Sequence, residues 1–67
     1  MKFAQRLKEM RNDSKMTQSQ LAKLIGVHQS MIVRWESGEC EPTVSNLFKL
    51  SEVFNCSADY LIGKTDI

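Results

Sequence analysis

The sequence has little cysteine, histidine, proline or glycine. Its 67 residues include two cysteines, one histidine, one proline and three glycines. Cys40 and Cys56 have no second cysteine nearby, so their spacing fits no zinc pattern, and a single histidine does not complete a site with them. We therefore expect no metal site, and two thiols that stay reduced.

Signatures of catalysis and of membrane insertion are missing as well. No apolar run approaches the ~20 residues that span a bilayer, and the amino-terminal stretch MKFAQRLKEM is charged and amphipathic, unlike a signal peptide. We find no carboxylate pair at catalytic spacing, no glycine-rich phosphate loop and no nucleophile elbow. A chain this short buries only about 60% of the surface that its unfolded form exposes, which leaves little room for a deep cleft. We expect a cytoplasmic protein of one domain over residues 1–67 that is not an enzyme and uses no cofactor or small-molecule ligand.

Charge is divided unevenly between the two halves of the chain. The net charge is +1, but residues 1–34 carry seven basic groups against two acidic ones, a balance of +5. Residues 35–67 carry two basic groups against six acidic ones, a balance of −4. Such an asymmetry is found in proteins with a face for a polyanion, but ordinary solvated helices show charge runs too. Charge alone therefore does not decide between these interpretations.

What the sequence does contain is helical periodicity bounded by capping residues. Apolar residues three and four positions apart predict a first helix over about residues 2–13. Thr17 and Gln20 form a Thr-x-x-Gln capping box that opens a second helix. Gly26 ends that helix, where a residue free to take positive φ is expected.

Three more helices are predicted after this point. The third covers about residues 28–36, a fourth begins after a cap at Thr43 or Ser45, and a short fifth has the sequence ADYLI. No segment alternates with period two, so we predict an all-α fold of five short helices with a core over about residues 3–63. Helices joined by a turn as short as the one after Gly26 must cross steeply, which is the geometry of a helix-turn-helix.

The third predicted helix divides its side chains into two faces. At about 100° per residue one face is apolar, carries Trp35 and suits packing against the other helices. The opposite face carries Gln29, Ser30, Val33 and Arg34. Glutamine bonds adenine N6 and N7 together, arginine forks onto guanine O6 and N7, and a valine methyl packs against a thymine methyl. A plain solvated face is the alternative, and the preceding helix and turn favour the interpretation as a base-reading helix.

The order of these segments resembles the lambda-repressor-like (Cro/cI, xenobiotic-response-element) helix-turn-helix regulators of bacteria and phages. The resemblance is carried by RLKEMR, TQSQLAKLIGV, WESG, EPTVSNLFKLSEVF and SADYLIG, in that order. It implies a compact five-helix domain that binds double-stranded DNA as a transcriptional regulator, in the simplest case a repressor. A single small domain contacts too few base pairs to be selective, so we expect a homodimer on a pseudo-palindromic operator. From position alone, Tyr60, Ile62 and the tail to Ile67 are expected to join the two copies.

The resemblance also implies roles for single positions. The four polar-face residues of the third helix correspond to base-contacting positions, with Val33 at the margin. The residues expected at the DNA backbone are Gln18, Lys23, His28, Ser37 and Gly38. Gln18 is further expected to brace Gln29, and Arg11 to form an ion pair with Glu36 between the first helix and the end of the third.

Three departures from the family pattern bear on these expectations. Lys15 stands where glycine is usual, so the turn after the first helix must take another conformation or bear strain. His28 replaces the usual serine or threonine cap, and is expected to cap weakly, touch a phosphate or be exposed. Glu39 and Glu41 make the next loop acidic, which would repel a nearby phosphate backbone.

A protein-interaction module on the same fold is the alternative function. Such a module would serve as the partner-binding half of an antitoxin, or as a regulator that contacts polymerase. Loss of sequence-specific DNA binding on mutation of Gln29 and Arg34 would separate the two.

Overall fold

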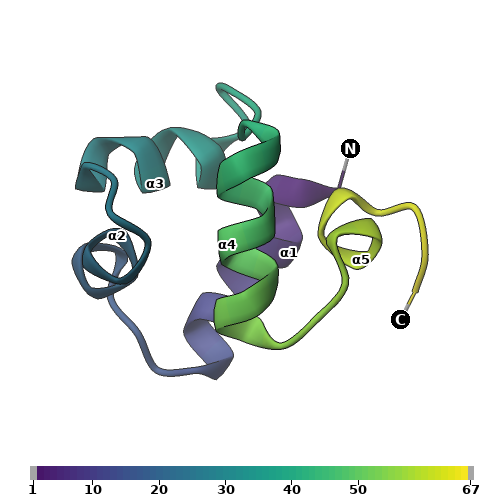
Figure 1. Ribbon diagram of the computed structural model, residues 1–67. Coiled ribbons are helices and arrows are strands. Elements are labelled where there is room, and N and C mark those ends of the chain that lie inside the picture. The colour runs from purple at the N-terminus through teal and green to yellow at the C-terminus, as the bar shows by residue number, and fades with distance from the viewer. Residues whose placement is uncertain (1, 67) are drawn as a thin grey trace.

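The computed structural model describes residues 2–66, in which five helices and no strand are present. The helices are α1 (Phe3–Asp13), α2 (Gln18–Ile25), α3 (Gln29–Ser37), α4 (Val44–Phe54) and α5 (Ala58–Ile62). In Figure 1, α4 stands in front of α1, with α2 and α3 on one side and α5 on the other. The predicted all-α architecture is confirmed, and no helix in this range is long and apolar enough to cross a membrane.

Side-chain caps and left-handed residues set the helix ends. The Gln20 backbone N–H donates to Thr17 Oγ1 at 3.0 Å, and the Thr17 backbone N–H donates to Gln20 Oε1 at 2.8 Å, so the predicted capping box is confirmed. Thr43, rather than Ser45, caps α4. Gly26 ends α2 with φ of 75°, as expected. These ends depend on local chemistry, which is why the sequence predicted them closely.

Lys15 settles the question raised by the missing glycine after α1. Its backbone keeps the left-handed conformation, with φ of 56°. A side chain in that conformation costs about 1–2 kcal/mol relative to the right-handed region. The turn therefore keeps the shape that glycine would favour and bears strain, and its Lys15 side chain is exposed to solvent.

The core draws apolar side chains from all five helices. Its buried members are Phe3, Leu7, Leu21, Ala22, Ile25, Ile32, Trp35, Leu50 and Leu61. Trp35 is 1% exposed and meets Phe3 edge to face, with ring centroids 6.1 Å apart. Met10 and Met31 are partly buried against this cluster. The predicted core role of Trp35 is therefore confirmed, and it anchors α3 to α1.

Arg6 holds the carboxyl-terminal segment against α1. Its Nη1 donates to the Tyr60 carbonyl oxygen at 2.5 Å and to the Thr65 carbonyl oxygen at 2.6 Å. The guanidinium carbon also lies 4.2 Å from the centroid of the Tyr60 ring. The cation therefore covers one face of that aromatic ring.

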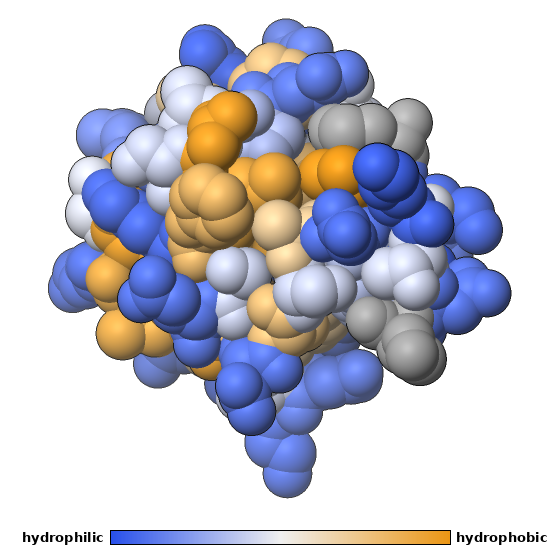
Figure 2. All heavy atoms as spheres, turned by 45° about the vertical axis from the view of Figure 1, so that its right-hand side comes forward, coloured by the Kyte–Doolittle hydropathy of each residue, from blue (hydrophilic) through white to orange (hydrophobic). Residues whose placement is uncertain are grey.

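One side of α4 is apolar and exposed. Val44 and Phe48, one helical turn apart, are 68% and 55% exposed. Figure 2 shows hydrophobic side chains gathered near the middle of the face that α4 and α5 present, with hydrophilic residues around them. Val44 and Phe48 thus leave an apolar patch on the solvent side of α4.

Gly63 ends α5 where the chain comes close to the start of α1. Its φ is 84°, and a Cβ at this position would lie 2.9 Å from the Lys2 Cβ. We expect Gly63→Ala to lower the free energy of unfolding by about 1–2 kcal/mol from the backbone alone, and further from this contact. Gly26→Ala is the matched control, with φ of 75° and no heavy atom within 4 Å of the added carbon. Urea denaturation that gave equal losses for both variants would show that the Lys2 contact has no effect.

Candidate nucleic-acid interface

Helices α2 and α3 form the predicted helix-turn-helix. Only three residues, Gly26 to His28, separate the two helices. The backbone N–H groups of Gly26 and Val27 both donate to the Ala22 carbonyl, at 2.9 and 3.0 Å, which closes α2 and turns the chain. In Figure 1, α2 is seen end-on while α3 lies across the view, so the two helices cross steeply. Half-buried Val27 packs against the core and fixes the turn.

The two predicted faces of α3 separate cleanly in the structure. Ile32 and Trp35 are 0% and 1% exposed and pack into the core. The exposed side chains of the helix include all four predicted base-contacting residues: Gln29, Ser30, Val33 and Arg34. Because the buried side chains lock the helix in place, the exposed ones are presented on a rigid support. Their contact with bases stays a prediction.

His28 is the N-cap of α3. Its Nδ1 accepts the Ser30 backbone N–H at 3.4 Å and lies 3.1 Å from Ser30 Oγ. The backbone bond is long for a hydrogen bond, and the residue is exposed, which agrees with the expected weak capping. A neutral ring that accepts at Nδ1 carries its proton on Nε2, which leaves a donor for a phosphate.

Arg11 and Glu36 form the ion pair that the resemblance implies. The Arg11 Nε lies 2.6 Å from Glu36 Oε2, and its Nη2 lies 3.0 Å from Glu36 Oε1. Arg11 Nη1 also donates to the Met16 carbonyl at 2.8 Å. The two side chains are 11% and 5% exposed. The hydrogen bond to Glu36 raises the pKa of Arg11, which burial alone would lower, so the pair joins α1 to the end of α3 as charged partners.

Gln18 is turned toward Glu36, and its expected brace to Gln29 stays a prediction. Gln18 Nε2 donates to Glu36 Oε1 at 3.2 Å, and no hydrogen bond joins Gln18 to Gln29 within residues 2–66. A carboxylate is a stronger acceptor than a neutral amide, which explains the preference. The amide of Gln18 therefore belongs to the Arg11–Glu36 cluster.

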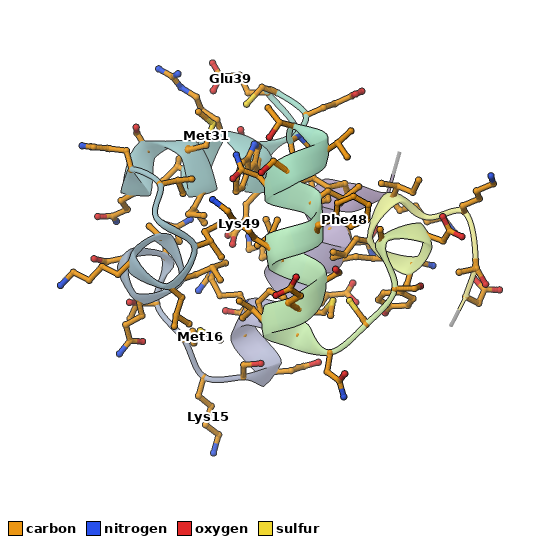
Figure 3. All side chains as sticks on the ribbon, in the orientation of Figure 1. Lys15, Met16, Met31, Glu39, Phe48 and Lys49 are labelled. Atoms are coloured by element: carbon orange, nitrogen blue, oxygen red, sulfur yellow. The ribbon has the colours of Figure 1, made fainter. Side chains whose placement is uncertain are left out.

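The remaining residues expected at the DNA backbone are exposed. Ser37 and Gly38 are exposed at the end of α3, and Gly38 takes φ of 80°. Lys23 is exposed too, but it lines a shallow depression of about 500 Å³ together with Lys15 and Met16. Figure 3 shows Lys15 and Met16 at the edge of the molecule opposite α3. Contact of Ser37, Gly38 and Lys23 with the DNA backbone stays a prediction.

The helix-turn-helix family model matches residues 7–61, which is most of the chain. The chain belongs to the helix-turn-helix family. It is similar to repressor protein C2 of Salmonella phage P22, with 40% identity over 60 residues that make up 90% of this chain and 28% of that protein. It is also similar to the transcriptional regulator DicA of Escherichia coli (strain K12), with 37% identity over 90% of this chain and 44% of the regulator.

Solved structures agree with this assignment. The crystal structure of the P22 c2 repressor in complex with synthetic operator 9T matches this helix-turn-helix chain with a TM-score of 0.89 and 36% identity, over 94% of this chain and 96% of that one. The chain spans less than half the length of the two curated relatives described above. One is named a repressor and the other a transcriptional regulator, and the family is one of transcription regulators and not of enzymes.

The loop after α3 of this helix-turn-helix domain is acidic and carries one of the two thiols. Glu39 and Glu41 are exposed, and Figure 3 shows Glu39 at the same edge of the molecule as α3. Cys40 Sγ lies 4.0 Å from Met31 Sδ. Both cysteines are free, and burial raises the pKa of the Cys56 thiol, which favours its protonated form. No group of metal-ligating side chains is present between residues 2 and 66.

Proposed function

We propose that this chain is the sequence-specific double-stranded DNA-binding domain of a transcriptional repressor. The observation that carries the proposal is the exposed face of α3, where an amide, a hydroxyl and a guanidinium are held by buried Ile32 and Trp35. An α-helix with such a face fits the major groove, which is about 12 Å wide. The similarity to a repressor crystallised with its operator supports the same use here.

Phosphate contacts would surround this face. His28 at the start of α3, the Ser37–Gly38 end and Gln18 at the start of α2 supply donors around it, and Lys23 on α2 supplies a positive charge. Such contacts set the register of a protein on DNA and do not distinguish sequences. The Glu39 carboxylate beside α3 would weaken this electrostatic attraction, so we expect a shallow salt dependence.

We further propose that two copies of the chain bind one operator through the apolar face of α4. Val44 and Phe48 replace Tyr60 as the expected contact, because the Arg6 guanidinium already covers the Tyr60 ring. Ile62 is half-buried, and Ile67 lies outside the described residues. A symmetric pair would place two α3 helices on half-sites one helical turn apart.

Selection of bound sequences from a random DNA pool tests this proposal directly. We expect a pseudo-palindromic site, on which Gln29→Ala and Arg34→Ala each weaken binding by about 1–3 kcal/mol, or about 5- to 150-fold. Lys8→Ala, which removes an exposed positive charge on α1, is the control for charge and is expected to change binding little. Titrations at two salt concentrations separate base readout from phosphate attraction. Binding without sequence preference, unchanged in both α3 variants, would contradict the proposal and favour the protein-interaction alternative.

A further inference from the structure

One buried carboxylate connects α3, which carries the proposed base-reading face, to α1 and α2. Glu36 accepts hydrogen bonds from Arg11 Nε, Arg11 Nη2 and Gln18 Nε2, at 2.6, 3.0 and 3.2 Å. Its side chain is 5% exposed, so water does not compete for these bonds. The last turn of α3 is therefore joined to α1 and to the first residue of α2 through a single group.

The bond to Glu36 determines how the Gln18 amide is turned. A carboxylate attracts the NH₂ end of an amide and repels its oxygen, so the nitrogen must face Glu36. The amide nitrogen carries two hydrogens, and Glu36 Oε1 uses one of them. Gln18 is also the first residue of α2, where unpaired backbone N–H groups favour a phosphate. The second N–H of the Gln18 side chain is thus left to donate at the start of α2, where an anion is favoured.

The negative charge of Glu36 is balanced by a neighbouring cation. Arg11 neutralises Glu36 across a paired contact of 2.6 and 3.0 Å, so the carboxylate orients Gln18 without presenting a net negative charge to DNA. Glu39 differs from it, because it is exposed on the loop beside α3 and forms no ion pair within residues 2–66.

We propose that Glu36 is a positioning residue for DNA binding: it holds one N–H of Gln18 so that the other meets a backbone phosphate of the operator. This inference rests on the proposed DNA-binding function. It assigns Glu36 a role beyond stability, since loss of its Gln18 bond would release the amide to rotate away from the phosphate.

A pair of charge-removing variants tests the role of Glu36. Simple electrostatics and the positioning role predict changes of opposite sign in the affinity for DNA. Glu36→Gln removes a negative charge near DNA, which would tighten binding if charge alone mattered. We expect it to weaken binding to the selected operator about fivefold, the effect of losing one coupling between neighbouring groups. Glu39→Gln removes the same charge from an exposed position on the loop beside α3 and is expected to bind as tightly as the unmodified protein or more tightly.

A double-mutant cycle with Gln18→Ala shows whether the two residues act together. If Glu36 works through Gln18, the double variant binds no worse than the weaker single variant. Operators with single methylphosphonate substitutions give a second readout: both single variants should lose sensitivity at the same phosphate and keep it elsewhere. Circular dichroism at low temperature verifies that each variant is folded, and Glu36→Asp, which keeps the charge for Arg11, replaces Glu36→Gln if that variant unfolds.

The outcomes separate the inference from the function on which it rests. Tighter binding by Glu36→Gln, or losses that multiply in the double variant, would overturn the positioning role while the protein still binds its operator. Failure of the unmodified protein to select any sequence would instead refute the proposed function, and the positioning role with it.

Discussion

Arg11→Met is expected to lower the free energy of unfolding by about 3–5 kcal/mol, the cost of leaving one partner of a buried ion pair unpaired. Glu36 is 5% exposed and would have an apolar side chain in place of its cation. The Met16 carbonyl would also lose its bond from Arg11. A domain of this size is stabilised by about 3–10 kcal/mol in total, from ~0.05–0.15 kcal/mol per residue. Urea denaturation followed by circular dichroism should therefore show a variant that is close to unfolding.

The double variant Arg11→Met with Glu36→Met distinguishes pairing from packing. Replacing both ions by apolar side chains of similar volume is often close to neutral, so most of the lost stability should return. Recovery should be incomplete, because the Gln18 amide then has no carboxylate to bind. A Lys8→Met control on the exposed side of α1 should change stability by less than ~0.5 kcal/mol. If the double variant is as unstable as the single one, the unpaired charge is not the cause of the stability lost in Arg11→Met.

Ile32→Ala is expected to lower the free energy of unfolding by about 2–5 kcal/mol, the range for removing a large side chain from a packed core. Ile32 is 0% exposed and holds α3 against the rest of the domain. Its neighbour Val33 is 44% exposed, so Val33→Ala should cost less than ~1 kcal/mol. Thermal unfolding measures both, and each kcal/mol corresponds to about 4–8 °C in a domain of this size.

In DNA titrations the two variants should rank the other way if the proposed function is correct: Val33→Ala, which costs less stability, should lose more affinity for DNA. Val33→Ala should stay folded and bind the selected operator more weakly, since its methyl groups would face a thymine methyl. Ile32→Ala, studied at a temperature where it is folded, should bind nearly as well as the unmodified protein. Similar stability losses for the two variants would contradict the assignment of faces on α3.

By itself, the sequence determined the helices, their ends and the two faces of α3. These features depend on groups that are close in the chain. The Thr17–Gln20 capping box lies within one helical turn, Gly26 ends α2 through its own backbone freedom, and the apolar stripe with Trp35 follows from helical spacing. The ion pair between Arg11 and Glu36, 25 residues apart, was predicted only through the family resemblance.

Tertiary structure alone decided which distant residues the long side chains contact. The approach of Glu36 to the start of α2 brought a carboxylate to the Gln18 amide, at 3.2 Å from its nitrogen. The same applies to Tyr60, whose ring is covered by Arg6 from a position 54 residues earlier. An amphipathic pattern defines a helix face but not its neighbour. Which apolar face is left uncovered, as on α4, depends on how the helices pack, and that is a property of the whole chain.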